Sequence, residues 1–145
     1  MTTLRLPRAM IDEMVEHALV DLPNECCGII AGSDGTAEKL YRTRNSEASP
    51  FRYNIHPEDL LQASREIDKN SWDVLVIYHS HVASEAYPSP TDVRLAQWDG
   101  TNPPTDLFPG AFYVLVSLKD RPDVIGVRAF TISAGNVEEA TLEAV

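Results

Sequence analysis

The spacing of apolar positions near the N-terminus predicts a helix that ends before Pro23. Its apolar face is made of residues three and four positions apart: Met10, Ile11, Met14, Val15, Ala18 and Leu19. Acidic residues lie between these positions, and His17 falls among the charges. The pattern therefore predicts an amphipathic helix with a solvated histidine.

Short apolar runs bounded by turn residues predict the strands. The run at residues 72–78 is apolar on both faces, which is typical of a central strand. The remaining strands are expected at residues 26–31, 40–44, 112–118 and 124–132, with turns at 33–35 and 120–123. Residues 137–145 fit either a strand or a tail.

Two further helices are predicted between the strands. One begins at Pro57, a residue favoured at the first helical position, and directs Leu60, Leu61, Ala63 and Ile67 to the core. The other covers residues 91–98, and the proline-rich segment 100–110 is expected to be a surface loop. These elements predict one mixed α+β domain over residues 1–145, with a central mixed β-sheet flanked by helices.

Composition narrows the functional classes. The net charge of −10 comes without a Lys/Arg cluster, which argues against nucleic acid as a partner. No apolar stretch approaches the roughly 18 residues of a membrane span, and the first residues lack the apolar core of a signal peptide. Cys26 and Cys27 are adjacent and poorly placed to bridge each other, so a reducing cytoplasm is the expected location.

The end of the central strand carries residues that can hold a metal ion. His79 and His81 are two positions apart, and alternate strand residues point to the same face. Asp92 follows after a loop and can return as a third ligand. Two imidazole nitrogens and one carboxylate oxygen suit catalytic Zn²⁺, which keeps its fourth position for water.

The same segment has a purely structural interpretation. Ser89, Pro90 and Asp92 fit the N-cap, first and third positions of a helix. A histidine at a strand end is also often only a hydrogen-bonded structural residue. Capping and metal binding are compatible, because a cap fixes the helix that presents Asp92.

The spacing His79-Ser80-His81, seven residues, Ser89, two residues, Asp92 resembles the JAMM signature of the MPN-domain metalloproteases. The signature also needs an upstream glutamate, and Glu25 stands before the first buried strand. Residues 45–53 and 85–88 are similar to small bacterial members, closest to the Mec-type peptidases. The chain departs from many members at Val82, where they have proline, and segment 100–110 is longer than expected for the Mec type.

The resemblance implies a JAMM/MPN (cytidine-deaminase-like) fold and one zinc ion per chain, held by His79, His81 and Asp92. It implies that Glu25 is the general acid–base and that Ser89 donates a hydrogen bond to the oxyanion. The implied substrate is a ubiquitin-like sulfur-carrier protein whose C-terminal tail is joined to cysteine or another small amine. Ser80 would point away from the metal, toward packing or hydrogen-bonding partners.

Other functional classes are weighed against this one. A non-catalytic module of the same fold and a metallohydrolase for small peptides or amides both stay open as alternatives. Cys26 and Cys27 lack the spacer of a redox dithiol and are expected to be small buried residues. His56-Pro57-Glu58 lacks the cysteine pair of a zinc deaminase, and no serine-hydrolase elbow is found.

Overall fold

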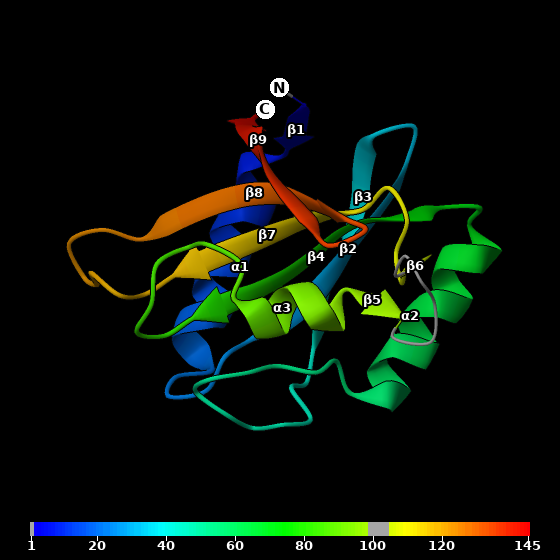
Figure 1. Ribbon diagram of the computed structural model, residues 1–145. Coiled ribbons are helices and arrows are strands. Elements are labelled where there is room, and N and C mark those ends of the chain that lie inside the picture. Colours follow the sequence, from blue (N-terminus) through cyan, green and yellow to red (C-terminus); the bar gives the residue numbers. More distant parts are fainter. Residues whose placement is uncertain (1, 99–104) are drawn as a thin grey trace.

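The computed structural model describes residues 2–98 and 105–145 and has a central sheet with helices on both faces (Figure 1). In chain order the elements are β1 (Thr3–Leu6), α1 (Arg8–Val20), β2 (Cys27–Ser33), β3 (Thr36–Thr43), α2 (Pro57–Lys69), β4 (Asp73–His81), α3 (Pro90–Leu95), β5 (Gln97–Trp98), β6 (Thr105–Asp106), β7 (Phe112–Ser117), β8 (Gly126–Ser133) and β9 (Asn136–Ala144).

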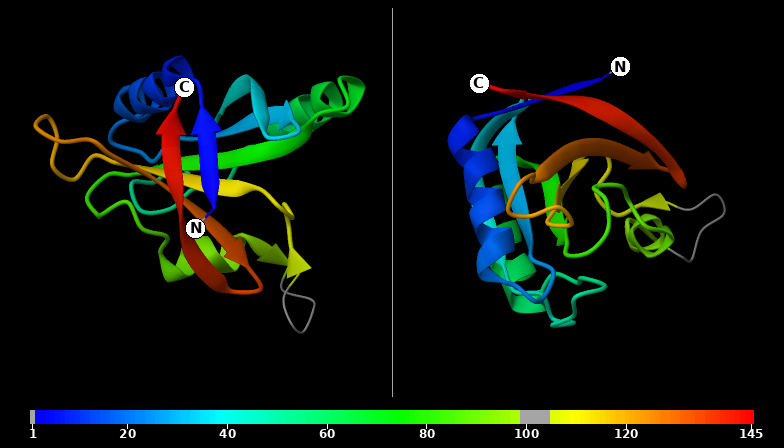
Figure 2. Two further views of the ribbon diagram at one scale, coloured as in Figure 1. Left: turned by 90° about the horizontal axis from the view of Figure 1, so that it is seen from above. Right: turned by 90° about the vertical axis from the view of Figure 1, so that its left-hand side faces the viewer.

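The sheet is mixed, with seven strands in the order β1-β9-β8-β7-β4-β2-β3. β4 lies inside it, antiparallel to β2 and parallel to β7. β1 closes one edge by pairing parallel to β9, so the first and last strands lie side by side (Figure 2). β5 and β6 form a separate pair of short strands.

Alternate residues of β4 face the two helical layers. Val76 and Tyr78 pack in one core with Met14 and Ala18 of α1. Ile77 packs in the other core, which also receives α2 and α3. Because strand residues alternate between faces, His79 and His81 lie on the same face as Ile77. β4 therefore delivers both imidazoles to the side of the sheet that α2 and α3 cover.

The mixed α+β class, the central strand and the turn at residues 120–123 are confirmed. The helix expected at residues 91–98 is wrong at its end, because α3 stops at Leu95 and Gln97–Trp98 pair with Thr105–Asp106. Leu61 is 51% exposed and does not face the core. Residues 100–104 of the predicted surface loop lie outside the described residues. Within the part that is described, no helix is both long and apolar enough to cross a membrane.

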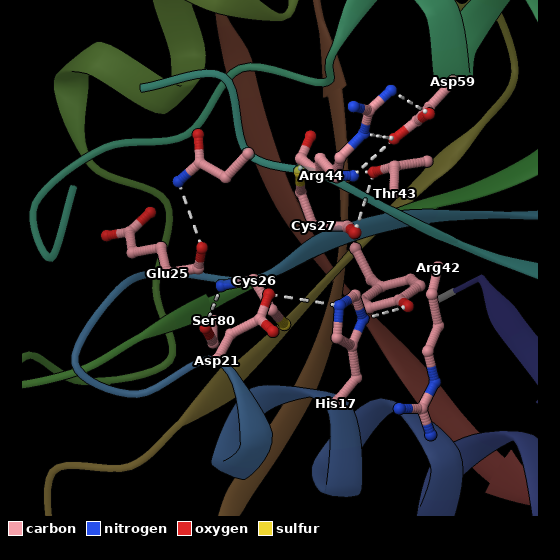
Figure 3. Close-up of polar contacts among 12 residues, drawn as sticks. His17, Asp21, Glu25, Cys26, Cys27, Arg42, Thr43, Arg44, Asp59 and Ser80 are labelled. Carbon is pink, nitrogen blue, oxygen red and sulfur yellow. Dashed lines mark hydrogen bonds and ion pairs between the residues drawn. The ribbon is translucent and has the colours of Figure 1, made fainter. Parts of the chain in front are cut away.

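The prediction of a solvated His17 is wrong, because this residue is only 4% exposed. Its Nδ1 lies 2.7 Å from the hydroxyl of Tyr78, and its Nε2 lies 3.2 Å from a carboxylate oxygen of Asp21 (Figure 3). A buried tyrosine hydroxyl needs a polar partner, and His17 supplies it across the α1 interface. Burial lowers the pKa of His17, although the Asp21 carboxylate opposes that effect.

Candidate metal centre

The end of β4 and the start of α3 bring His79, His81 and Asp92 together. All three side chains are buried, with residue exposures of 1%, 4% and 6%. The local sequence fixes α3 through a capping box, as the spacing of Ser89 and Asp92 predicts. The Ser89 hydroxyl accepts from the Asp92 N–H at 3.0 Å, and Asp92 Oδ2 accepts from the Ser89 N–H at 2.9 Å.

Three potential ligand atoms meet at one point. His79 Nε2 and His81 Nε2 are 3.2 Å apart, and Asp92 Oδ2 lies 3.1 Å from the first and 3.0 Å from the second. A tetrahedral zinc site with bonds of about 2.0–2.1 Å separates neighbouring ligand atoms by about 3.3–3.4 Å. The triangle formed by these three atoms is therefore close in size to one face of the ligand tetrahedron around zinc. The three residues form a group able to hold a metal ion.

The hydrogen bond on the far side of His81 sets its tautomer. His81 Nδ1 lies 2.8 Å from the carbonyl oxygen of Glu85, which can only accept, so Nδ1 carries the proton. In its neutral form His81 then turns the lone pair of Nε2 toward His79 and Asp92, whereas in its protonated form Nε2 donates to Asp92. Holding a metal-binding histidine through its other nitrogen is a common arrangement that fixes the ring orientation. A cation at the centre of the triangle would relieve the repulsion between its electron-rich atoms.

The charges in this group are strongly perturbed. Burial opposes ionisation of Asp92, but hydrogen bonds from His79 and His81 outweigh it and hold the pKa of the carboxyl well below its usual range. Burial lowers the pKa of His79, and Asp92 offsets that effect only in part. Burial acts the same way on His81, yet its bonds to Asp92 and to the Glu85 carbonyl raise the pKa. A buried anionic oxygen beside two imidazoles favours a cation.

Glu25 is held in the segment between α1 and β2 (Figure 3). The residue is buried, at 4% exposure, and its backbone N–H donates to the carbonyl of Ser49 at 2.9 Å. Within the described residues its Oε1 has no hydrogen-bond partner. Burial raises the pKa of Glu25 to about 8, His81 lowers it and Asp92 raises it further. A carboxyl group with this pKa can accept and return a proton near neutrality.

Among the residues that the structure describes, the Ser89 hydroxyl has a capping role as an acceptor and no acceptor for its own hydrogen. Its oxygen accepts the Asp92 N–H, whereas its hydroxyl hydrogen remains able to donate elsewhere. Since Ser89 is only half-buried, that hydrogen can reach a molecule bound beside the Asp92 carboxylate.

Two features of the site were not singled out in the sequence. The ring of Tyr53 stacks on His79, with centroids 4.2 Å apart and planes inclined by 21°. Tyr53 also lines a groove of about 240 Å³ with Ile77, Leu107 and Phe108. The groove lies on the site face of the sheet, and Tyr53 belongs both to its wall and to the contact with His79. The likeness of residues 45–53 to family members was the available signal, but it did not identify the ring that touches His79.

The residues considered for other chemistries are structural. Cys26 and Cys27 are fully buried, and burial raises the pKa of each thiol to about 12, which argues against a thiolate nucleophile. His56 caps α2 by accepting the N–H of Glu58 through Nδ1 at 3.2 Å. The expectation of small buried cysteines is thus confirmed.

Two proteins of similar sequence carry names that describe a peptidase or a protease. A CysO-cysteine peptidase of Mycobacterium tuberculosis is 38% identical over 138 residues, which cover 94% of this chain and 87% of that protein. A probable TtuB-protein conjugate cleaving protease of Thermus thermophilus is 34% identical over 96 residues, covering 66% of this chain and 64% of that protein.

Solved structures share the fold. A protein from Desulfitobacterium hafniense, 32% identical, superimposes with a TM-score of 0.80 over 100% of this chain and 93% of its own. A structure described as JAMM, a metalloprotease-like zinc site in the proteasome and signalosome, gives a TM-score of 0.59 at 19% identity and covers 99% of both chains. The family model for prokaryotic homologs of the JAB domain matches residues 7–133. The chain therefore belongs to this family of prokaryotic JAB-domain proteins.

Proposed function

We propose that this protein is a zinc-dependent JAMM-type peptidase that hydrolyses the amide bond after the C-terminal tail of a ubiquitin-like sulfur-carrier protein. The amine released is cysteine or another small amine. The observation that carries the proposal is the convergence of His79 Nε2, His81 Nε2 and Asp92 Oδ2 within 3.0–3.2 Å of one another. The names of the two relatives supply the substrate class.

Each side chain has a role that fits its environment. His79, His81 and Asp92 would hold Zn²⁺, which supplies an activated water and polarises the scissile carbonyl when bound. Glu25 would accept a proton from the attacking water and return it to the leaving amine, for which its raised pKa is suited. Ser89 donates its free hydroxyl hydrogen to the oxygen on which negative charge develops.

The carrier tail would reach the histidines through the groove that Tyr53 lines. The groove has a volume of about 240 Å³, and apolar side chains form much of its wall. An extended C-terminal tail is slim enough for such a groove, whereas the folded part of a carrier would stay outside. Cleavage therefore depends on a flexible tail that carries the scissile amide.

The test is mass spectrometry of a carrier–cysteine adduct incubated with the protein. We expect the carrier with a free C-terminal carboxylate and an equal amount of cysteine, loss of cleavage with a chelator, and recovery with Zn²⁺. An intact adduct would contradict the proposal and favour a non-catalytic binding module of the same fold. Equal cleavage of the folded adduct and of its isolated tail peptide would favour a hydrolase for small peptides.

A further inference from the structure

Ser80 lies between the two histidines but faces the opposite side of β4. It is fully buried, with 0% exposure. Its hydroxyl oxygen accepts a hydrogen bond of 2.8 Å from the backbone N–H of Cys26, the residue that follows Glu25 (Figure 3). The serine between two metal-binding candidates therefore contacts the backbone next to the acid–base candidate.

This bond stands where the ladder between β2 and β4 ends. Cys27 and His79 are the last paired residues of the two strands. One position further, the Ser80 N–H donates to the Cys26 carbonyl at 3.2 Å, as in an ordinary antiparallel pair. The return bond from the Cys26 N–H goes to the Ser80 hydroxyl rather than to its carbonyl. The hydroxyl thus holds the chain at the position where it leaves the sheet toward Glu25.

The other backbone groups of Glu25 are held by a different part of the chain. The Glu25 N–H donates to the Ser49 carbonyl, and the Glu25 carbonyl accepts from the side chain of Asn45 at 3.0 Å. Both partners belong to the segment between β3 and α2. Within the described residues the Glu25 Oε1 has no hydrogen-bond partner. The position of the carboxylate relative to the histidines therefore depends on the hydrogen bonds that join the nearby backbone to β4. Those of Cys26 are the nearest in sequence.

We propose that Ser80 is a positioning residue that holds the Cys26 amide and thereby sets the Glu25 carboxylate against His79 and His81. The kinetic consequence rests on the proposed function, whereas the hydrogen bond itself does not. A displacement of about 1 Å in a reacting group can slow turnover by about 10²-fold. A β-hydroxyl at this position accepts the Cys26 N–H and a methyl group cannot, so threonine should replace serine and alanine should not.

The experiment compares Ser80→Ala and Ser80→Thr with Thr43→Val as a matched control. Thr43 is also buried, and its hydroxyl donates to the Cys27 carbonyl at 2.8 Å, so the control removes a similar bond to β2 on its other side. For Ser80→Ala we expect unchanged zinc content, KM within about threefold and kcat lower by about 10–100-fold. Ser80→Thr should restore kcat to within about threefold, and Thr43→Val should leave it unchanged.

A double variant distinguishes the positioning of Glu25 from a general loss of rigidity in the fold. If Ser80 acts through Glu25, adding Ser80→Ala to Glu25→Gln should cause no further loss of kcat. A normal kcat in Ser80→Ala, an equal loss in Thr43→Val, or additive losses in the double variant would overturn the proposal. If Ser80→Ala does not fold, Ser80→Cys keeps the side-chain size with a weaker acceptor and should show the same losses in smaller degree.

Amide hydrogen exchange tests the same link without any substrate. In Ser80→Ala the Cys26 amide should exchange about tenfold faster than in the unaltered protein or in Ser80→Thr. Unchanged exchange at Cys26 would overturn the positioning role. Failure of the unaltered protein to cleave any carrier adduct would instead refute the proposed function, so the two outcomes are distinguishable.

Discussion

Replacing Glu25 with glutamine is expected to separate proton transfer from metal binding. Glutamine keeps the size of the buried side chain but cannot accept the proton of water. The loss of a general acid–base lowers turnover by about 10²–10⁴-fold, or about 2.7–5.5 kcal/mol in the barrier. Zinc content should stay at one per chain, since Glu25 is not among the three converging ligand atoms.

The same substitution has a second effect that can be worked out for the metal-free protein. Burial raises the pKa of Glu25 from its ordinary value of 4.5 to about 8. Between these values the folded state binds more protons than the unfolded chain, so this contribution to stability is complete below pH 4.5 and is lost as pH rises to about 8. A single group changes the free energy of unfolding by at most about 1.4 kcal/mol per pH unit.

Two assays check this reasoning. Steady-state kinetics with a carrier adduct, combined with metal analysis, measures the catalytic effect. Urea unfolding of the chelated protein at pH 5, 6, 7 and 8 measures the stability effect, and Glu25→Gln should lose less stability over this range. Near-normal turnover in the variant would remove Glu25 from the chemistry. The same pH slope in both proteins would show that its carboxyl is not a buried group with a raised pKa.

Three further perturbations follow from the contacts. His79→Ala and Asp92→Ala should each lose zinc together with activity, which metal analysis checks; full zinc occupancy in both would contradict the site. Ser89→Ala should keep zinc but lower kcat by about 10²–10³-fold, because Ser89 is the oxyanion donor of the proposed mechanism. Its lost cap should also reduce the free energy of unfolding by about 1 kcal/mol, which an unchanged unfolding midpoint would contradict. Tyr78→Phe should lower the free energy of unfolding by about 1–3 kcal/mol, since it leaves His17 Nδ1 buried without its partner. The control Tyr41→Phe should cost less, because Tyr41 is more exposed. Equal losses in the two variants would refute the buried pair.

The parts of the fold that local sequence dictates were predictable. The periodicity around Met14 specifies α1, and the apolar run before His79 specifies a central strand. Ser89 and Asp92 indicate the start of α3, because their side chains form its capping box. Each of these depends on contacts between residues that are close in the sequence, so a pattern of residue types is enough to recognise them.

Contacts between residues that are far apart in the sequence could not be predicted. β1 has four residues and is stable only because β9, from the other end of the chain, lies beside it. The burial of His17 depends on Tyr78, which is 61 positions away. Its place seven residues after Met10 on the apolar stripe was a usable signal, but the neighbouring charges suggested solvent instead.

The site was predictable in composition rather than in geometry. The spacing of His79, His81 and Asp92 indicated a metal centre, but it gave no partner for the second ring nitrogen of His81. The Glu85 carbonyl that fixes this nitrogen belongs to the backbone, which has no residue-type signature. The role of Ser80 toward Cys26 is hidden for the same reason, because one of the two partners is a main-chain amide.

X-ray absorption spectroscopy of the zinc-loaded protein tests the central claim most directly. We expect one zinc per chain with two imidazole nitrogens and two oxygens at about 2.0–2.2 Å, one oxygen from Asp92 and the other from exchangeable water. Sulfur at about 2.3 Å, or four ligands that all come from the protein, would contradict an open catalytic site built from His79, His81 and Asp92.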